Sequence, residues 1–211
     1  LTMTVGTFDT SSGSANVTVN GTIQCGATCG TIDMTTTGTN TFTQSVVASK
    51  SFGTNVAVAT NWTFYNLTFQ SNAAATITIN GTGTGQIIVS NDLNLVNNGG
   101  ALVLDNNTND RIVDLNGSAT IAAATTFSSA PTRSFTLAGN FTNNGTYTSA
   151  TETLTLTSTS PTATIKTNGS TLYALTINGT GGTYTLQDAL TTSNNLTITN
   201  GTLDVSATNC S

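Results

Sequence analysis

The chain has 211 residues, of which only 6% are charged, with four basic residues, nine acidic residues and no histidine. Four basic residues cannot neutralise a run of phosphates, so nucleic-acid binding is excluded. Without histidine, a Ser-His or Cys-His nucleophile cannot be assembled, and nothing in the sequence indicates a cofactor. Thr fills about a quarter of the chain, so hydroxyls and amides must provide solubility in place of charge.

Residues 1–60 are expected to form an N-terminal β head or the first coils of a longer structure. They begin with "LTMTVGTF", which alternates like a strand, and they contain "CGATC". Cys25 and Cys29 fit a small disulfide loop, with two free thiols or half of a metal site as alternatives. A metal site would need further ligands. Cys210 has no obvious mate, so it is either an unpaired thiol or a bridge to another subunit.

The sequence of residues 61–211 indicates repeated units, each made of a strand, a turn and a second strand. Short alternating segments such as "NLTFQSNAAATITINGTG", "NDLNLVNNGGALVLD" and "NNLTITNGTLDV" are broken by Asn and Gly. No stretch has sustained helical periodicity. Residues 64–105 align with residues 172–205, and in this alignment Tyr65 corresponds to Tyr173. The chain therefore repeats internally, with an irregular period.

Two all-β architectures use such units. In a parallel β-solenoid, coils of roughly 20 to 25 residues stack about 4.8 Å apart, which gives roughly eight to ten coils. In a β-sandwich, the Asn-Gly dipeptides are hairpin turns, and a strand added from one subunit to the next joins the copies.

The solenoid is the favoured prediction for three reasons. The units resemble one another more closely than sandwich strands need to. Aromatic residues make up 6% of the chain, which is few for a sandwich core, and small branched side chains suit the inside of a narrow coil. Finally, Asn-rich corners can stack into amide ladders.

The densest acidic group is Asp105, Asp110 and Asp114 in "LDNNTNDRIVDLNG". Carboxylates bind Ca²⁺ or act in pairs in glycoside hydrolases. However, neither an EF-hand spacing nor a Ca²⁺-binding nonapeptide is present. The favoured interpretation is a solvated loop in which Arg111 offsets an acid, and no catalytic or metal-binding residue is predicted.

Two further patterns concern the surface. Thr-x-Thr runs are typical of ice-binding faces, but here they occur at uneven intervals. Asn-x-Ser/Thr sequons are abundant, and the glycosylation candidates are Asn16, Asn20, Asn61, Asn66, Asn80, Asn116, Asn140, Asn144, Asn178, Asn195 and Asn200.

The two ends carry no visible cap, since both alternate like the strands between them. Open strand edges and an exposed apolar cross-section favour addition of another chain. The candidate inter-subunit contacts are Leu1, Met3, Val5, Phe8, Leu196, Ile198, Leu203 and Val205. A joint of this kind propagates head to tail, and Cys210 would reach Cys25 or Cys29 of the neighbour.

The segments "NLTITNGTLDVSATNC", "LYALTINGTGGTYTLQDALTTSNNLTI" and "AGNFTNNGTYTSATETLTLTSTS" resemble the Thr/Asn-rich repeat proteins of bacterial cell surfaces. The resemblance covers roughly residues 60 to 207. It implies parallel β-helix segments shown outside the cell as adhesins or surface fibres, with no catalytic residue to carry over.

We therefore expect a non-enzymatic structural subunit of an extracellular or cell-surface filament, whose partners are copies of itself. The alternatives are a monomeric adhesin that binds a glycan or host surface, and an ice-binding or polysaccharide-degrading solenoid. No apolar run is long enough to span a membrane, and the chain opens at Leu1, so a removed or omitted leader and export are expected.

Overall fold

The computed structural model is a parallel β-solenoid of about eight turns. It describes residues 1–3, 6–10, 13, 15–25, 30–35, 40–54, 59–81 and 83–206, and these contain strands but no helix. The all-β solenoid prediction is confirmed. All strand pairs in these ranges are parallel, so the β-sandwich alternative is wrong. Its strong hairpin signal, "LTITNGTLDV", does not form a hairpin, because the residues on both sides of Asn200-Gly201 pair in parallel with β23.

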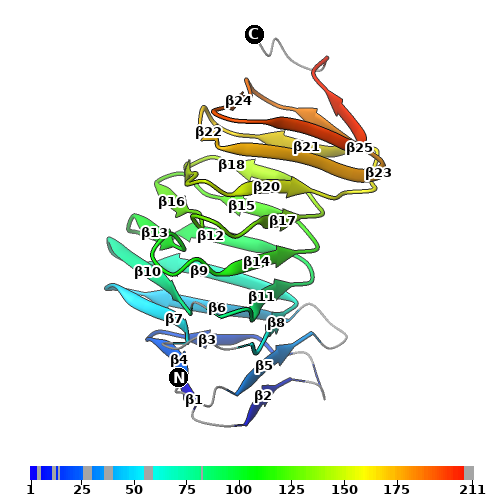
Figure 1. Ribbon diagram of the computed structural model, residues 1–211. Helices are drawn as coiled ribbons and strands as arrows, with labels where there is room; N and C mark the ends of the chain where they lie inside the picture. The colour runs from blue at the N-terminus through cyan, green and yellow to red at the C-terminus, as the bar shows by residue number, and fades with distance from the viewer. Residues whose placement is uncertain are drawn as a thin grey trace.

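Each turn of the solenoid has three strands, which contribute to three faces (Figure 1). Face 1 contains β1 (Thr2–Met3), β4 (Ile23–Cys25), β7 (Lys50–Thr54), β10 (Ala75–Asn80), β13 (Leu102–Asp105), β16 (Thr125–Ser128) and β19 (Thr146–Thr148). Face 2 contains β2 (Thr7–Asp9), β5 (Thr31–Met34), β8 (Trp62–Phe64), β11 (Gln86–Val89), β14 (Ile112–Leu115), β17 (Phe135–Leu137) and β20 (Thr153–Leu156).

Face 3 contains β3 (Val17–Val19), β6 (Thr41–Val46), β9 (Asn66–Ser71), β12 (Leu93–Asn97), β15 (Ala119–Ile121), β18 (Phe141–Asn143) and β21 (Ala163–Lys166). In the last turns the strands continue from face 2 into face 3, because β23 (Ala174–Leu186) and β25 (Leu196–Asp204) each run across both faces. Two short strands, β22 (Thr171–Leu172) and β24 (Thr191–Thr192), form a separate parallel pair. Strands β1 to β7 belong to the same faces as the strands that follow residue 60.

The strands stay in register although the coils differ in length. Phe135 pairs with Leu154, 19 residues later, whereas Ile32 pairs with Trp62, 30 residues later. Some of the extra residues lengthen the strands, since β6 and β7 have six and five residues where β18 and β19 have three each. Inward side chains still stack on inward side chains. A one-residue slip would turn every apolar side chain outwards, which explains why the register is kept although the coils differ in length.

The interior is filled by alternating residues from all three faces. Although aromatic residues are few, most of them point inwards, which differs from the expected interior of small branched side chains. Phe52 on face 1 contacts Trp62 on face 2 and Phe69 on face 3, with ring centroids 5.4 and 4.9 Å apart in edge-to-face geometry. All three are buried. Large rings therefore bridge the faces where the cross-section has most room.

Glycine is required where a corner lies directly on the backbone of the preceding coil. At Gly117, between β14 and β15, a Cβ would overlap the main chain of Asn91. At Gly21, by contrast, a Cβ would meet nothing within 4 Å. Corner spacing is thus set by backbone contact between coils, and not by side chains.

We predict that Gly117→Ala lowers the free energy of unfolding by about 1 to 3 kcal/mol, because overpacking forces the two coils apart. Gly21→Ala is the matched control and should change it by less than about 0.5 kcal/mol. Chemical denaturation followed by circular dichroism measures both. Equal stability of the two variants would contradict backbone contact at this corner.

Candidate assembly interface at the ends of the solenoid

The last strand, β25, pairs with β23 along one edge, and among the described residues no strand lies along its other edge. Its inward positions continue columns from the coil below. Leu175 and Ile177 are fully buried there, whereas their column neighbours Leu196 and Ile198 are 47% and 52% exposed. The residue types hardly change between the two coils. The difference in exposure therefore arises because, among the residues that the structure describes, no coil covers β25.

The first strands show the same unpaired edge and the same increase in exposure at the other end of the stack. Strands β1, β2 and β3 each pair with one described neighbour, namely β4, β5 and β6. Phe8 and Val17 are only partly buried, while Ile32 and Phe42, which lie next to them in the second coil, are fully buried. Strands β1 and β25 lie at opposite ends of the stack (Figure 1).

The predicted inter-subunit contacts thus fall into three groups. Leu1, Leu196, Ile198 and Val205 are exposed, and they are four of the five large apolar side chains exposed among the described residues. Phe8 and Leu203 are partly buried against the core, and Met3 is buried. Val5 lies outside the described residues.

A column of hydrogen-bonded side chains, which we call the corner ladder, runs along the corner where faces 2 and 3 meet. Its members occupy one register position on successive coils and are Asn16, Thr41, Asn66, Asp92, Ser118, Asn140 and Thr164. In five places, a side-chain oxygen accepts the backbone N–H of the residue one coil further on, at 2.9 to 3.2 Å. It differs from the amide ladder predicted for the Asn-rich corners, because its rungs join a side-chain oxygen to a backbone N–H and its members include Asp, Ser and Thr.

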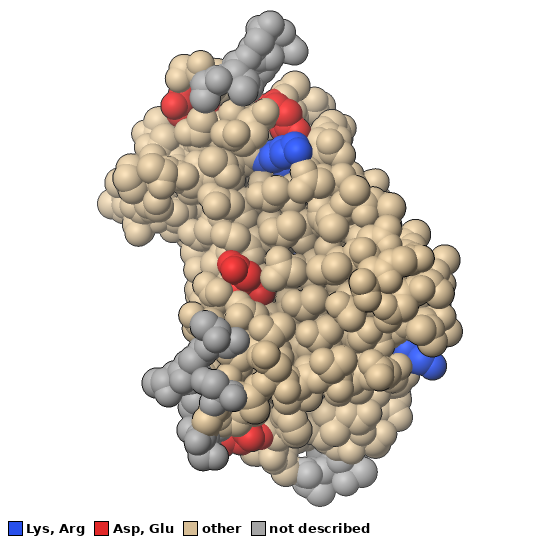
Figure 2. Space-filling model, turned by 180° about the vertical axis from the view of Figure 1, so that it is seen from behind, with Lys and Arg blue, Asp and Glu red and all other residues tan. Residues whose placement is uncertain are grey.

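The outward column next to the ladder on face 3 is chemically different. It consists mainly of threonines, and its members are Thr18, Thr43, Thr68, Asn94, Thr120 and Thr142. The uneven intervals between Thr residues in the sequence disappear here, because strand register aligns them coil by coil. Figure 2, which shows one side of the molecule, has mostly uncharged surface with isolated acidic and basic side chains.

The acidic group does not form a shared site. Asp105 accepts hydrogen bonds from Asn107 and Thr108 within its own loop. Asp110 accepts hydrogen bonds from the backbone and hydroxyl of Thr132 and from the backbone of Arg133 in the next coil. Burial raises the pKa of Asp114 on face 2. Among the described residues, no three His, Cys, Asp or Glu side chains are placed to share a metal ion.

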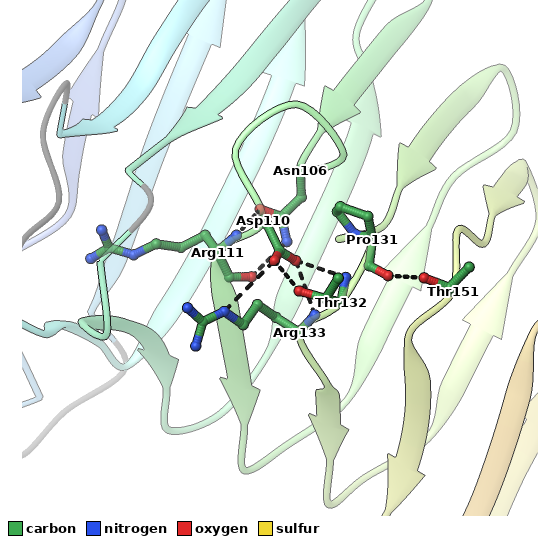
Figure 3. Close-up of polar contacts among 7 residues, drawn as sticks. All are labelled: Asn106, Asp110, Arg111, Pro131, Thr132, Arg133 and Thr151. Carbon is green, nitrogen blue, oxygen red and sulfur yellow. Dashed lines mark hydrogen bonds and ion pairs between the residues drawn. The ribbon is translucent and has the colours of Figure 1, made fainter.

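Arg111 does not offset an acid, so that part of the sequence interpretation is wrong. Its side chain is 1% exposed and points away from Asp110, while Arg133 forms the ion pair with Asp110 at 3.7 Å (Figure 3). The position of Arg111 follows the inward alternation of β14. One guanidinium nitrogen donates to the Thr60 carbonyl at 3.2 Å, and Nε and Nη1 have no partner. Desolvation lowers the pKa of Arg111 to about 10.

Cys25 is buried and disulfide-bonded. Cys29 and Cys210 lie outside the described residues. Because Cys25 is already bonded within the chain, it is not a free thiol for a bridge from Cys210 of a neighbouring copy.

The sequons lie mainly on strands and corners. Eight of the candidate asparagines are exposed, namely Asn16, Asn20, Asn61, Asn116, Asn144, Asn178, Asn195 and Asn200, and Asn66, Asn80 and Asn140 are partly buried. Several already use their amides within the solenoid, as when Asn200 donates to Asn178 at 2.8 Å. Asn16, Asn195 and Asn200 lie at the two ends.

No family model matches the sequence, and comparisons with characterised proteins and with solved structures find no match either. The part of the chain that the structure describes contains no helix of the length and apolarity needed to cross a membrane.

The corner ladder predicts a difference between two neighbouring side chains on β9. The oxygen of Asn66 accepts from Asn91 and Asp92, at 2.8 and 3.2 Å, whereas Thr68 makes no side-chain hydrogen bond. Asn66→Ala should lower the free energy of unfolding by about 1 to 3 kcal/mol because it leaves two donors unpaired. Thr68→Ala, the control, should change it by less than about 0.5 kcal/mol. Urea denaturation distinguishes them, and similar losses would contradict a stabilising ladder.

Asp110 and Asp114 should respond to pH with opposite sign. Partial burial raises the pKa of Asp110, but hydrogen bonds from Thr132 and Arg133 outweigh it, so the folded pKa lies below 3.8. Its contribution to stability is therefore present above pH 3.8 and is lost as the pH falls through the folded pKa. Asp110→Asn should cost about 1 kcal/mol at pH 7 and little at pH 2.

Asp114 provides the matched comparison, because its folded pKa lies above 3.8 and its charge is destabilising. Asp114→Asn should therefore increase stability at pH 7, with the gain lost at low pH. Thermal unfolding of both variants at pH 2, 4 and 7 measures these changes in stability. A loss of stability in both at pH 7 would contradict the assignment for Asp114.

Proposed function

We propose that the protein is a non-enzymatic structural subunit of an extracellular or cell-surface filament, in which copies join head to tail through the ends of the solenoid. The observation that carries this proposal is the change in exposure along single columns. Leu175 is fully buried and Leu196, one coil further, is 47% exposed. One more coil on β25 would bury it, and β2 and β3 of another copy offer strands of faces 2 and 3 for this edge.

Backbone hydrogen bonds and apolar burial would both stabilise such a joint. Roughly five backbone hydrogen bonds contribute about 0.5 to 1.5 kcal/mol each. Full burial of a Leu or Ile side chain contributes about 1.5 to 3 kcal/mol, and Leu196 and Ile198 are about half exposed. Together with Phe8 and Val17 opposite them, these terms approach the roughly 8 kcal/mol of micromolar affinity, before the entropic cost of association.

The geometry of the joint also favours a filament over a closed dimer. The surface formed by β25 is different from the surface formed by β1, β2 and β3, so the contact is heterologous. Because the strands are parallel, each added copy presents a new open β25 pointing in the same direction. A contact of this kind does not close on itself, and it propagates.

The composition of the protein surface supports an extracellular or cell-surface location. Hydroxyl and amide side chains occupy many of the outward positions of the strands, and the net charge of −5 comes from few charged groups. Such a surface remains soluble without depending on pH. The resemblance to Thr/Asn-rich surface proteins points in the same direction.

An adhesin is the second candidate, and the Thr column of face 3 favours it. Thr43, Thr68, Thr120 and Thr142 lie in register, and their hydroxyls make no hydrogen bond within the described structure. A regular row of free hydroxyls suits contact with a hydroxyl-rich surface. Binding to immobilised polysaccharide by a monomer would favour this function, and Thr68→Ala combined with Thr120→Ala would weaken it.

Assembly should depend on the exposed apolar residues at the ends and not on others. We expect wild-type protein to form long polymers in negative-stain electron micrographs and to sediment as large species. Ile198→Lys should abolish them, because it places a desolvated charge in the joint. Val47→Lys is the matched control, since Val47 is 66% exposed but lies between β6 and β7, and this variant should still polymerise.

Circular dichroism should show folded protein for both variants. A wild-type protein that stays monomeric at millimolar concentration would contradict the proposed function. Undiminished polymers of Ile198→Lys would contradict the joint.

A further inference from the structure

The corner ladder has a direction. Asn66 accepts the N–H of Asp92, Asp92 accepts the N–H of Ser118, and Asn140 accepts the N–H of Thr164. In each step the acceptor is a side-chain oxygen of the earlier coil, and the donor is a backbone group of the later coil. At these coils the ladder position therefore presents an acceptor towards the C-terminal end and a donor towards the N-terminal end.

The two ends of the chain preserve this polarity. Thr164 pairs with Thr185 and Thr185 pairs with Asp204, so the column ends at the Asp204 carboxylate. That side chain is partly buried, and it accepts hydrogen bonds from Ser206, including one from the backbone N–H at 2.8 Å. At the opposite end the column begins at Asn16, whose backbone N–H makes no hydrogen bond in the described structure. A negatively charged acceptor thus faces outwards at one end, and an unpaired donor at the other.

The apolar columns give the same alignment independently. On face 2 one inward column runs unbroken from Phe8, through Ile32 and Trp62, to Leu196. On face 3 another runs from Val17 to Leu186. Val205 follows Asp204 and therefore occupies the position above Leu186.

We infer that the corner ladder continues from one copy to the next, with Asp204 of one copy accepting the Asn16 N–H of the following copy, in a register that stacks Leu196 on Phe8 and Val205 on Val17. This inference rests on the proposed function, and it specifies the partner surface. A shift of two residues keeps apolar side chains inside but separates Asp204 from Asn16. Only the unshifted register satisfies the ladder and both apolar columns together.

Cross-linking tests the register at outward positions. Thr197 lies in the same face 2 column as Asp9, which begins that column. In the inferred register these residues are neighbours on adjacent strands, about 4.8 Å apart, within the Cα range of about 4.4 to 6.8 Å for a disulfide. Asn195, two residues earlier, would be about 8 Å from Asp9.

The variants carry Cys210→Ser to remove the terminal thiol. Polymers of Thr197→Cys with Asp9→Cys should form intermolecular disulfides upon mild oxidation, at least about tenfold more than polymers of Asn195→Cys with Asp9→Cys. Non-reducing gels measure the yield. Polymers in which the Asn195 pair cross-links equally well or better would overturn the register but leave the filament intact. Absence of polymers in wild type and all variants would overturn both proposals.

Substitution of Asp204 tests the ladder itself. Asp204→Ala should raise the critical concentration for polymerisation about tenfold, since it removes a hydrogen bond to a charged acceptor. Asp204→Asn keeps an acceptor oxygen and should restore assembly most of the way. Polymers that form equally well with all three residues would overturn the ladder across the joint, and they would leave head-to-tail assembly standing.

Discussion

The structure depends on one constraint, which is that no coil buries its own apolar side chains. Each turn is a thin layer, and its inward residues are covered only when another layer lies above them and another below. The buried Ile177 and the half-exposed Ile198 differ in this respect alone. Stability in such a stack is approximately a sum of contacts between neighbouring layers, so the two end layers are inherently incomplete.

The corners give the stack its second property, a direction. Backbone pairing between parallel strands fixes the spacing of the coils, and the ladder of side-chain acceptors fixes which coil donates and which accepts. Buried polar groups elsewhere follow the same logic of local satisfaction. Gln44, for example, donates from the interior to the carbonyl oxygens of Gly21 and Ser51, at 2.8 and 3.0 Å. Satisfaction is not complete in the described residues, since Oε1 of the same Gln44, Oδ1 of Asn40 and two nitrogens of Arg111 are buried without a hydrogen-bond partner.

Much of the fold was predictable because it depends on alternation. Strands with apolar residues at every second position and corners with Asn and Gly indicate a solenoid without knowledge of the register. However, alignment of the sequence repeats does not place each strand on the correct face. Tyr65 and Tyr173 align in sequence, but Leu67 after the first lies on face 3 and Leu175 after the second lies on face 2. All three faces use the same inward alternation, so a repeat does not reveal which face it belongs to.

The candidate interface was predictable to a similar degree. Leu196, Ile198 and Val205 were identified because they continue an alternating pattern at the end of the sequence, whereas the burial of Met3 depends on packing that no local pattern encodes. The role of Asp110 was hidden because its partners, Thr132 and Arg133, lie a whole coil later. Corner lengths vary too much for such pairs to be found by a fixed interval.

The central claim is that the ends of the solenoid are completed by another copy. Amide hydrogen exchange, measured by mass spectrometry over a range of protein concentrations, tests it most directly. The account predicts that amides of β25 and of β2 and β3 become protected as concentration rises, while those of β11 to β15 do not change. Exchange at β25 that stays fast at every concentration at which the middle coils are protected would contradict it.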